Sequence, residues 1–174
     1  MDVRLPNIMI SGTPGTGKSE TSRLLVDLLG DRFRHIEVGP LVAEKGLHDG
    51  KDDEFDAWLV NDDKIVDELE ETVSSGGNFV DFHAVELFPE RWFDLVVILR
   101  TDNSVLWDRL TKRKYSMKKI QENIEAEIMQ VILQEARESY KLEIIVELQS
   151  NTIDQLEHNV QWIMNWINQY MKKS

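Results

Sequence analysis

The chain has 174 residues, of which 41% are hydrophobic and 30% charged, as expected for one folded domain with its own core. Its net charge of −12 disfavours general nucleic-acid binding, because phosphate contacts need a basic face. The absence of cysteine excludes disulfides and thiolate metal sites. With no signal-peptide h-region and no apolar run of membrane-spanning length, we expect no membrane association and a cytosolic or nuclear protein.

Short apolar runs alternate with helical patterns along the chain. Strands are predicted, in order, at residues 7–11, 35–38, 78–82, 94–99 and 143–148. Helices are predicted at 18–29, 62–74, 103–110, 118–140 and 152–171. The pattern in 118–140 places Ile120, Ile124, Ile128 and Val131 on one helix face. This alternation predicts an α/β fold in one domain, residues 1–174, with a parallel sheet covered by helices on both faces.

A phosphate-binding loop follows the first predicted strand. Gly12, Gly17, Lys18 and Ser19 match G-x-x-x-x-G-K-[ST] between a strand and a helix, the P-loop pattern. Glycines allow a tight turn whose N–H groups converge on phosphate oxygens at the positive end of the helix. The expected N–H donors are those of Gly15, Thr16, Gly17, Ser19 and Glu20. Lys18 would reach the terminal phosphates, and the carboxylate of Glu20 is expected to point away.

The nucleotide is expected to be ATP, bound with Mg²⁺. Guanine-binding GTPases use an Asn/Thr-Lys-x-Asp motif, and the segment TKRK at 111–114 lacks the aspartate. Ser19 would ligate Mg²⁺ through its hydroxyl, and Asp81, at the carboxyl end of a predicted strand, would hold the ion on the other side. His83 would point to the same side as Asp81 if that strand continued, where it could orient a water, contact phosphate or satisfy a backbone group. His35, His48 and His158 have no metal-site spacing.

Two arginines open a basic run after the fourth predicted strand. Residues 109–119 contain six basic and no acidic residues, whereas residues 44–71 contain twelve acidic and three basic ones. Arg109 and Arg113 are four apart and share a helix face. Phosphoryl transfer needs alignment and positive charge on the moving group, which a mobile segment carrying two arginines supplies. A solvated surface remains the alternative for either charge run.

Six segments together carry a family resemblance: PNIMISGTPGTGKSE, HDGKDDEFD, VDFHAVELFPERW, VVILRTDNSVLWDRLTKRKY, IEAEI and IIVELQSN. With these segments in this order, the chain resembles the adenylate kinase isoenzyme 6 family of nuclear adenylate kinases and ribosome-assembly ATPases. The resemblance implies a three-layer P-loop fold of nucleoside monophosphate kinase type with a five-stranded parallel core. It also implies an AMP-side insert at 37–60 and a short lid at 112–122.

The resemblance implies roles for individual residues as well. Arg113 would contact ATP and Arg109 would clamp phosphate, while the loop that contains Asn151 and Thr152 would lie against adenine. Asp81 and His83 match a D-x-H motif linked to ATP hydrolysis. Family members convert ATP and AMP to two ADP, hydrolyse ATP, and associate with a platform protein of the small ribosomal subunit during maturation of its pre-rRNA. A monomer found in nucleus and cytoplasm is therefore expected.

One position departs from the adenylate kinase pattern. Ala43 stands where these enzymes place a basic residue after the V-G-x-L turn, and Lys45 follows two residues later. Pro40 also replaces a more usual acidic residue. Alanine cannot bind the AMP phosphate, so Arg91 or Arg100 becomes a candidate for that contact.

Three functions remain open at this point. The first is a nucleoside monophosphate kinase that prefers AMP and also hydrolyses ATP. The second is an assembly factor whose ATP cycle switches a protein contact, with the acidic run 44–71 facing a basic ribosomal protein. The third is another small-molecule kinase, such as a shikimate-type enzyme, against which the adenylate-kinase-like motifs count.

Overall fold

A central five-stranded parallel sheet organises the molecule. The computed structural model describes residues 4–54 and 57–173. The sheet order is β2-β5-β1-β6-β7, and every recorded pairing in it is parallel. Its strands are β1 (Asn7–Ser11), β2 (Arg34–Glu37), β5 (Asn78–Asp81), β6 (Leu95–Arg100) and β7 (Ile145–Gln149). The predicted five-stranded α/β fold is confirmed.

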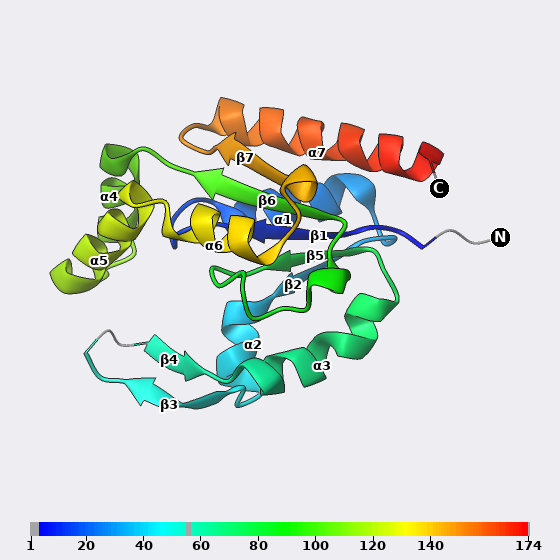
Figure 1. The fold of residues 1–174 in the computed structure, drawn as a ribbon. Helices are drawn as coiled ribbons and strands as arrows, with labels where there is room; N and C mark the ends of the chain where they lie inside the picture. Colours follow the sequence, from blue (N-terminus) through cyan, green and yellow to red (C-terminus); the bar gives the residue numbers. More distant parts are fainter. Residues whose placement is uncertain (1–3, 55–56, 174) are drawn as a thin grey trace.

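Helices cover both faces of this sheet (Figure 1). On one face α1 (Lys18–Leu29) and α7 (Ile153–Lys173) bury Leu25, Val160 and Ile163 against Ile8 and Phe79. The other face is covered by α2 (Val38–Glu44), α3 (Asp62–Ser74) and α6 (Val131–Ser139). The three layers therefore hold two apolar cores, one on each side of the strands.

Two segments project beyond the carboxyl ends of the strands. The first contains α4 (Asn103–Lys112) and α5 (Met117–Ile128), called here the lid helices. The second is the antiparallel hairpin of β3 (His48–Asp52) and β4 (Ala57–Val60). Short 3₁₀ turns occupy Glu90–Trp92 and Leu142–Ile144. None of the helices in the described part of the chain is long and apolar enough to cross a bilayer.

The single helix predicted at 118–140 is wrong. Gln130 adopts a left-handed backbone with φ 56° and ψ 39°, and the chain divides there into α5 and α6. Ile128 is 56% exposed and Val131 is also exposed, so the predicted apolar face does not continue through the break. The turn separates a lid helix from a helix whose Leu133 and Ala136 belong to the core.

The hairpin β3–β4 and helix α2 fill the segment that the sequence assigns to an AMP-side insert, residues 37–60. The sequence did not predict this hairpin. Residues 112–122, assigned to a lid, form the turn between α4 and α5 and the first part of α5. Ser116 begins α5 by accepting a hydrogen bond from the backbone N–H of Lys119 at 3.2 Å, a side-chain N-cap.

Candidate active site

The glycine loop has the strained backbone that its sequence requires. Gly15 and Gly17 both have φ of 94°, in the left-handed region that side chains disfavour. A Cβ at Gly15 would also lie 2.8 Å from Cδ1 of Leu106 on α4, so that the buried Leu106 side chain would have to move. The loop thus packs tightly under the lid helix and leads into α1. The backbone N–H of Thr16, one of the expected phosphate donors, instead donates to the carbonyl of Thr13 at 3.2 Å.

Lys18 occupies the centre of this loop. Its Nζ donates to the carbonyls of Gly12 and Thr13 at 3.1 and 3.3 Å. Desolvation by the surrounding protein, opposed by the negative charge of Asp81, lowers the pKa of Lys18 to about 8. The ammonium is therefore positioned at the phosphate loop, and it is more acidic than that of a free lysine.

The two predicted magnesium ligands lie side by side. Ser19 Oγ is 2.8 Å from Asp81 Oδ2, and Asp81 is only 3% exposed at the end of β5. Ser19 Oγ also lies 3.1 Å from Glu37 Oε1 at the end of β2. Since one hydroxyl proton cannot satisfy two carboxylates, this group of oxygens suits a hard divalent cation. Ser19 and Asp81 would hold Mg²⁺ there together with phosphate oxygens.

Sequence reasoning missed His35 and Glu37, which the sheet places next to Asp81. His35 Nε2 is 2.9 Å from Asp81 Oδ2, and the strand register pairs Glu37 with Asp81. Both residues lie in the strand predicted at residues 35–38, which could have indicated a site at its end. The sequence did not show that this strand pairs with the strand that ends at Asp81. In the described residues, no three His, Cys, Asp or Glu side chains form a metal site by themselves.

His83 lies just beyond β5, which ends at Asp81 instead of continuing as the sequence interpretation required. Part of its side chain is open to solvent, and the rest lies against the protein and lines a cavity beside the site. Desolvation and the positive charges of Lys18 and Lys119 lower the pKa of His83 to about 4. The ring is therefore neutral near pH 7 and can accept a hydrogen bond on one nitrogen.

A cavity of about 370 Å³ lies on one side of the loop and is called here the donor cavity. It is lined by Gly15, Gly17, Glu20, Arg109, Lys112, Arg113, Ser150, Thr152, Ile153 and Leu156. Arg109 Nη1 donates to the carbonyls of Gly15 and Ser150 at 3.1 and 2.9 Å, so this side chain ties α4 to the loop. Apolar side chains next to two arginines suit a purine beside its phosphates.

The residues around this cavity differ in part from those that the sequence singled out. Glu20 lines it, whereas Asn151 is not among its lining residues. The side-chain oxygen of Asn151 accepts a hydrogen bond from the backbone N–H of Asp102 at 2.7 Å. Thr152 lines the cavity as expected, and the sequence did not single out Ile153 and Leu156.

A second cavity, of about 450 Å³, lies on the other side of the loop and is called here the acceptor cavity. It is lined by Thr13, Pro14, Ala57, His83, Tyr115, Lys119, Glu122, Asn123, Ala126 and Ile132. Most of these residues come from the glycine loop and α5, with Ala57 from β4, His83 from the segment after β5, Tyr115 from the turn before α5 and Ile132 from α6. The cavity therefore lies between the lid and the hairpin. The phosphate loop is thus the shared wall of two cavities.

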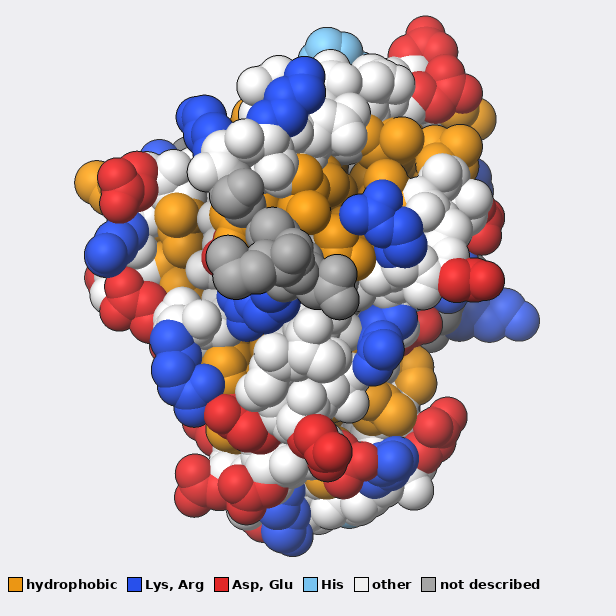
Figure 2. Space-filling model, turned by 90° about the vertical axis from the view of Figure 1, so that its right-hand side faces the viewer, with side chains coloured by type: hydrophobic (Ala, Val, Ile, Leu, Met, Phe, Trp, Pro, Cys, Tyr) orange, Lys and Arg blue, Asp and Glu red, His pale blue; other side chains and the backbone are white. Residues whose placement is uncertain are grey.

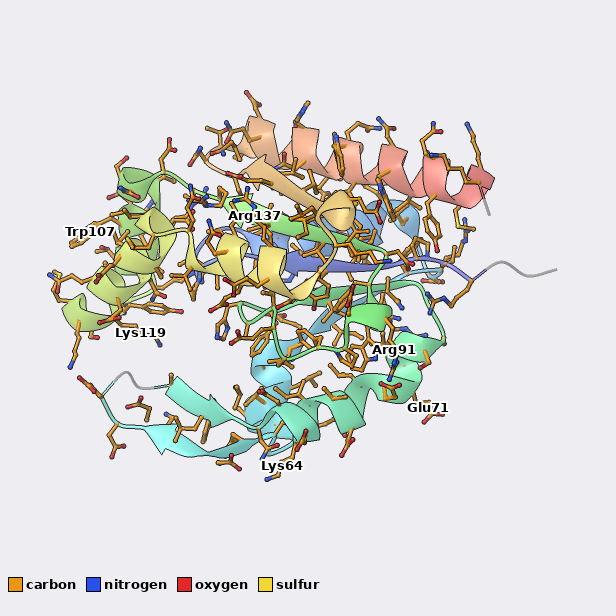
Figure 3. All side chains as sticks on the ribbon, viewed as in Figure 1. Lys64, Glu71, Arg91, Trp107, Lys119 and Arg137 are labelled. Carbon is orange, nitrogen blue, oxygen red and sulfur yellow. The ribbon has the colours of Figure 1, made fainter. Side chains whose placement is uncertain are left out.

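The cations proposed for the acceptor phosphate are already engaged. Lys45 Nζ lies 2.6 Å from Glu68 Oε1, and Ala43 is exposed. Arg91 pairs with Glu70 at 2.8 Å beside α3, at the end of the molecule away from Lys119 (Figure 3). Arg100 Nε lies 3.0 Å from the buried carboxylate of Glu127. Neither arginine is placed to bind an acceptor phosphate.

Glu127, in the last turn of α5, is a third site-related residue that the sequence did not reveal. It is 3% exposed and accepts hydrogen bonds from Thr13 Oγ1 at 2.9 Å and from the Thr101 backbone at 2.8 Å. With Arg100, these contacts join the lid helix to the glycine loop and to the end of β6. The sequence placed Glu127 only in the helix predicted at 118–140 and in the segment IEAEI, outside the predicted lid.

The site combines a P-loop with Ser19 and Asp81 as magnesium ligands and with Arg109 and Arg113 from the lid helix. This combination defines a P-loop nucleotide kinase. An AAA domain family model matches residues 8–130. The shikimate kinase of Acinetobacter baumannii shares the fold, with TM-score 0.67 and 17% identity over 95% of this chain and 94% of that one.

Curated relatives identify the family more narrowly. The chain is 50% identical to the adenylate kinase isoenzyme 6 homolog of Dictyostelium discoideum, over 97% of this chain and 95% of that protein. It is 41% identical to the adenylate kinase isoenzyme 6 homolog FAP7 of Saccharomyces cerevisiae, over 97% and 85%. The chain belongs to the adenylate kinase isoenzyme 6 family, as its motifs predicted.

Proposed function

We propose that the protein transfers the γ-phosphoryl group of ATP to AMP, giving two ADP, and also hydrolyses ATP. The observation that carries this proposal is the placement of two cavities on opposite sides of one phosphate loop. The donor cavity suits ATP, and a second cavity bordered by the lid and the hairpin suits a second substrate. A shared phosphate-binding wall brings the two reacting groups together.

The side chains of the site supply alignment and positive charge. Lys18 and the loop N–H groups bind the terminal phosphates, and Arg113 adds charge from the end of α4. Arg109, bound to two loop carbonyls, positions the lid helix over the loop. Mg²⁺ held by Ser19 and Asp81 would neutralise phosphate charge. Closure of the lid helices toward the hairpin would exclude water.

The proposed hydrolysis uses the same donor cavity and phosphate loop as the kinase reaction. A water molecule in the acceptor cavity takes the place of AMP, and neutral His83 accepts its hydrogen bond and orients it. We expect His83→Ala to weaken hydrolysis while ATP binding is retained. Loss of ATP binding in this variant would contradict an orienting role.

A coupled assay of ADP formation tests the proposed function. ADP production from ATP is measured with and without AMP, and AMP is expected to stimulate it with two ADP formed per AMP consumed. No stimulation by AMP would overturn the kinase function and leave the ATPase. Lys18→Ala is the site control, since it should abolish both activities, and substantial residual turnover would show that the site is misplaced.

We also propose a role in maturation of the small ribosomal subunit and its 18S rRNA, in nucleus and cytoplasm, through contact with a basic ribosomal protein. In this alternative, the ATP cycle switches the contact and kinase turnover is incidental. Asp53 and Glu54 are exposed on the hairpin segment, and Asp52 is half-buried. Figure 2 shows acidic side chains also gathering low on the face that lies at the right of Figure 1, at the height of α3. Such a surface complements a basic partner.

Charge neutralisation tests this partner. The variant Asp52→Asn, Asp53→Asn, Glu54→Gln and Asp56→Asn removes the hairpin charge; Asp56 lies outside the described residues. Weaker binding to the basic platform protein of the small subunit is expected, while the AMP-stimulated assay separates this role from kinase turnover. An unchanged affinity would overturn the proposed contact.

A further inference from the structure

The acceptor cavity requires a cation that the AMP-side helix does not provide. A nucleoside monophosphate carries a charged phosphate, which a protein binds through charge-assisted hydrogen bonds. On α2, Ala43 has no polar side chain, and the neighbouring Lys45 is paired with Glu68. A phosphate in this cavity must therefore find its positive charge on another element.

Lys119 on α5 supplies that charge. Among the described residues that line the acceptor cavity, it is the one lysine or arginine. Figure 3 shows it between α5 and the β3–β4 hairpin. Its ammonium lies 4.3 Å from the ring centroid of Tyr115, which also lines the cavity. A cation–π contact orients the ammonium without neutralising it, so its N–H donors remain available to an anion.

The placement of Lys119 also suits phosphoryl transfer. Lys18 Nζ lies 3.3 Å from the carbonyl oxygen of Thr13, and Thr13 lines the acceptor cavity together with Lys119. Thr13 and Pro14 of the glycine loop line that cavity as well. Glu122, one turn further along α5, would repel a phosphate from its own part of the wall. The charges therefore favour the side of the cavity that faces the loop.

We propose that Lys119 binds the 5′-phosphate of the acceptor nucleoside monophosphate and takes the place of the base missing at Ala43. The assignment rests on the proposed kinase function, because it concerns the acceptor of that reaction. It places acceptor recognition on the lid instead of on α2. Closing the lid then brings the acceptor phosphate toward the loop in the same movement.

Binding of AMP and adenosine to Lys119→Gln tests this directly by calorimetry. Losing a charge-assisted hydrogen bond should raise the dissociation constant for AMP at least about tenfold. The constant for adenosine, which has no phosphate, should change by less than about twofold. Lys119→Arg keeps the charge and should recover most of the AMP affinity. Lys114→Gln is the matched control, since it removes an exposed lysine of the same lid outside this cavity.

The outcomes separate this inference from the proposed function. If the wild-type protein neither binds AMP nor is stimulated by it, the kinase function itself fails. If the wild type binds AMP and Lys119→Gln binds it equally well, only the assignment of Lys119 is overturned. Equal losses for AMP and adenosine would also overturn it, because the residue would then affect the nucleoside and not the phosphate. A thermal melt of each variant confirms that it is folded.

Discussion

Ser19 Oγ at the start of α1 lies 2.8 Å from Asp81 Oδ2 at the end of β5, although 62 positions separate the two residues. The contact exists because β1 and β5 are neighbours in the sheet, and the register pairs Ile10 with Asp81. The loop that follows β1 therefore returns over the end of β5. Parallel strands present their carboxyl ends at one edge, and ligands bind there.

Asp81→Asn should raise the Mg²⁺ concentration needed for half-maximal turnover by about tenfold or more, because an amide binds a hard cation less strongly than a carboxylate. A magnesium titration of ADP formation measures the shift. ATP binding in the presence of a chelator is the control and should be unchanged or tighter, since a negative charge near the phosphates has been removed. An unaltered magnesium requirement would mean that Asp81 has another role.

Glu127→Ala should destabilise the fold by about 3–5 kcal/mol, because it leaves Arg100 and the Thr101 N–H without their buried partner. Chemical denaturation measures the loss. Glu147→Ala is the matched control: it removes the other carboxylate near Arg100, at 3.4 Å and exposed, and should cost at most about 1 kcal/mol. Similar losses in the two variants would contradict the central position given to Glu127.

Gly15→Ala should lose most of its ATP affinity, because the added Cβ meets Leu106 at 2.8 Å and the φ of 94° disfavours a side chain. Gly46→Ala is the control for the same substitution at a positive φ outside the nucleotide site. Gly46 has φ of 64° and no atom within 4 Å of an added Cβ. Its ATP affinity, measured by nucleotide titration, should remain close to that of the wild type.

Proton uptake should accompany ATP binding above pH 8. The pKa of Lys18 is lowered to about 8 in the free protein, so the side chain loses its proton as the pH rises through that value. Bound phosphates favour the charged form of Lys18, so a deprotonated Lys18 takes up a proton from solvent when ATP binds. Because this uptake becomes more costly as the pH rises, ATP binding weakens at higher pH. Calorimetry at pH 8.5 in buffers of different ionisation enthalpy measures the uptake. Lys18→Arg, which stays charged, should take up none.

The parts of the site that are close in sequence were predictable. Gly12, Gly17, Lys18 and Ser19 act through a local loop, so their spacing alone indicates a phosphate site. Asp81 was predicted from a general rule about strand ends. His35 and Glu37 could not be predicted because their role depends on β2 lying next to β5, and the order of strands is a long-range property.

The helical break at Gln130 shows the same limit. The apolar period of residues 118–140 favours one helix, and local propensity offers no glycine or proline to end it. In the structure, Glu127 is bound to the loop and β6 while Leu133 and Ala136 are buried under the sheet. Both sets of contacts can form only if the chain turns between them.

The sequence alone determined the fold class, the family and the phosphate loop, because periodicity and local spacing encode them. The tertiary structure decided what surrounds the phosphates. It engaged Lys45, Arg91 and Arg100 in ion pairs and directed Lys119 into the acceptor cavity. Those assignments depend on which charges meet in space, and residues distant in the chain meet only after the sheet, the lid and the hairpin have come together.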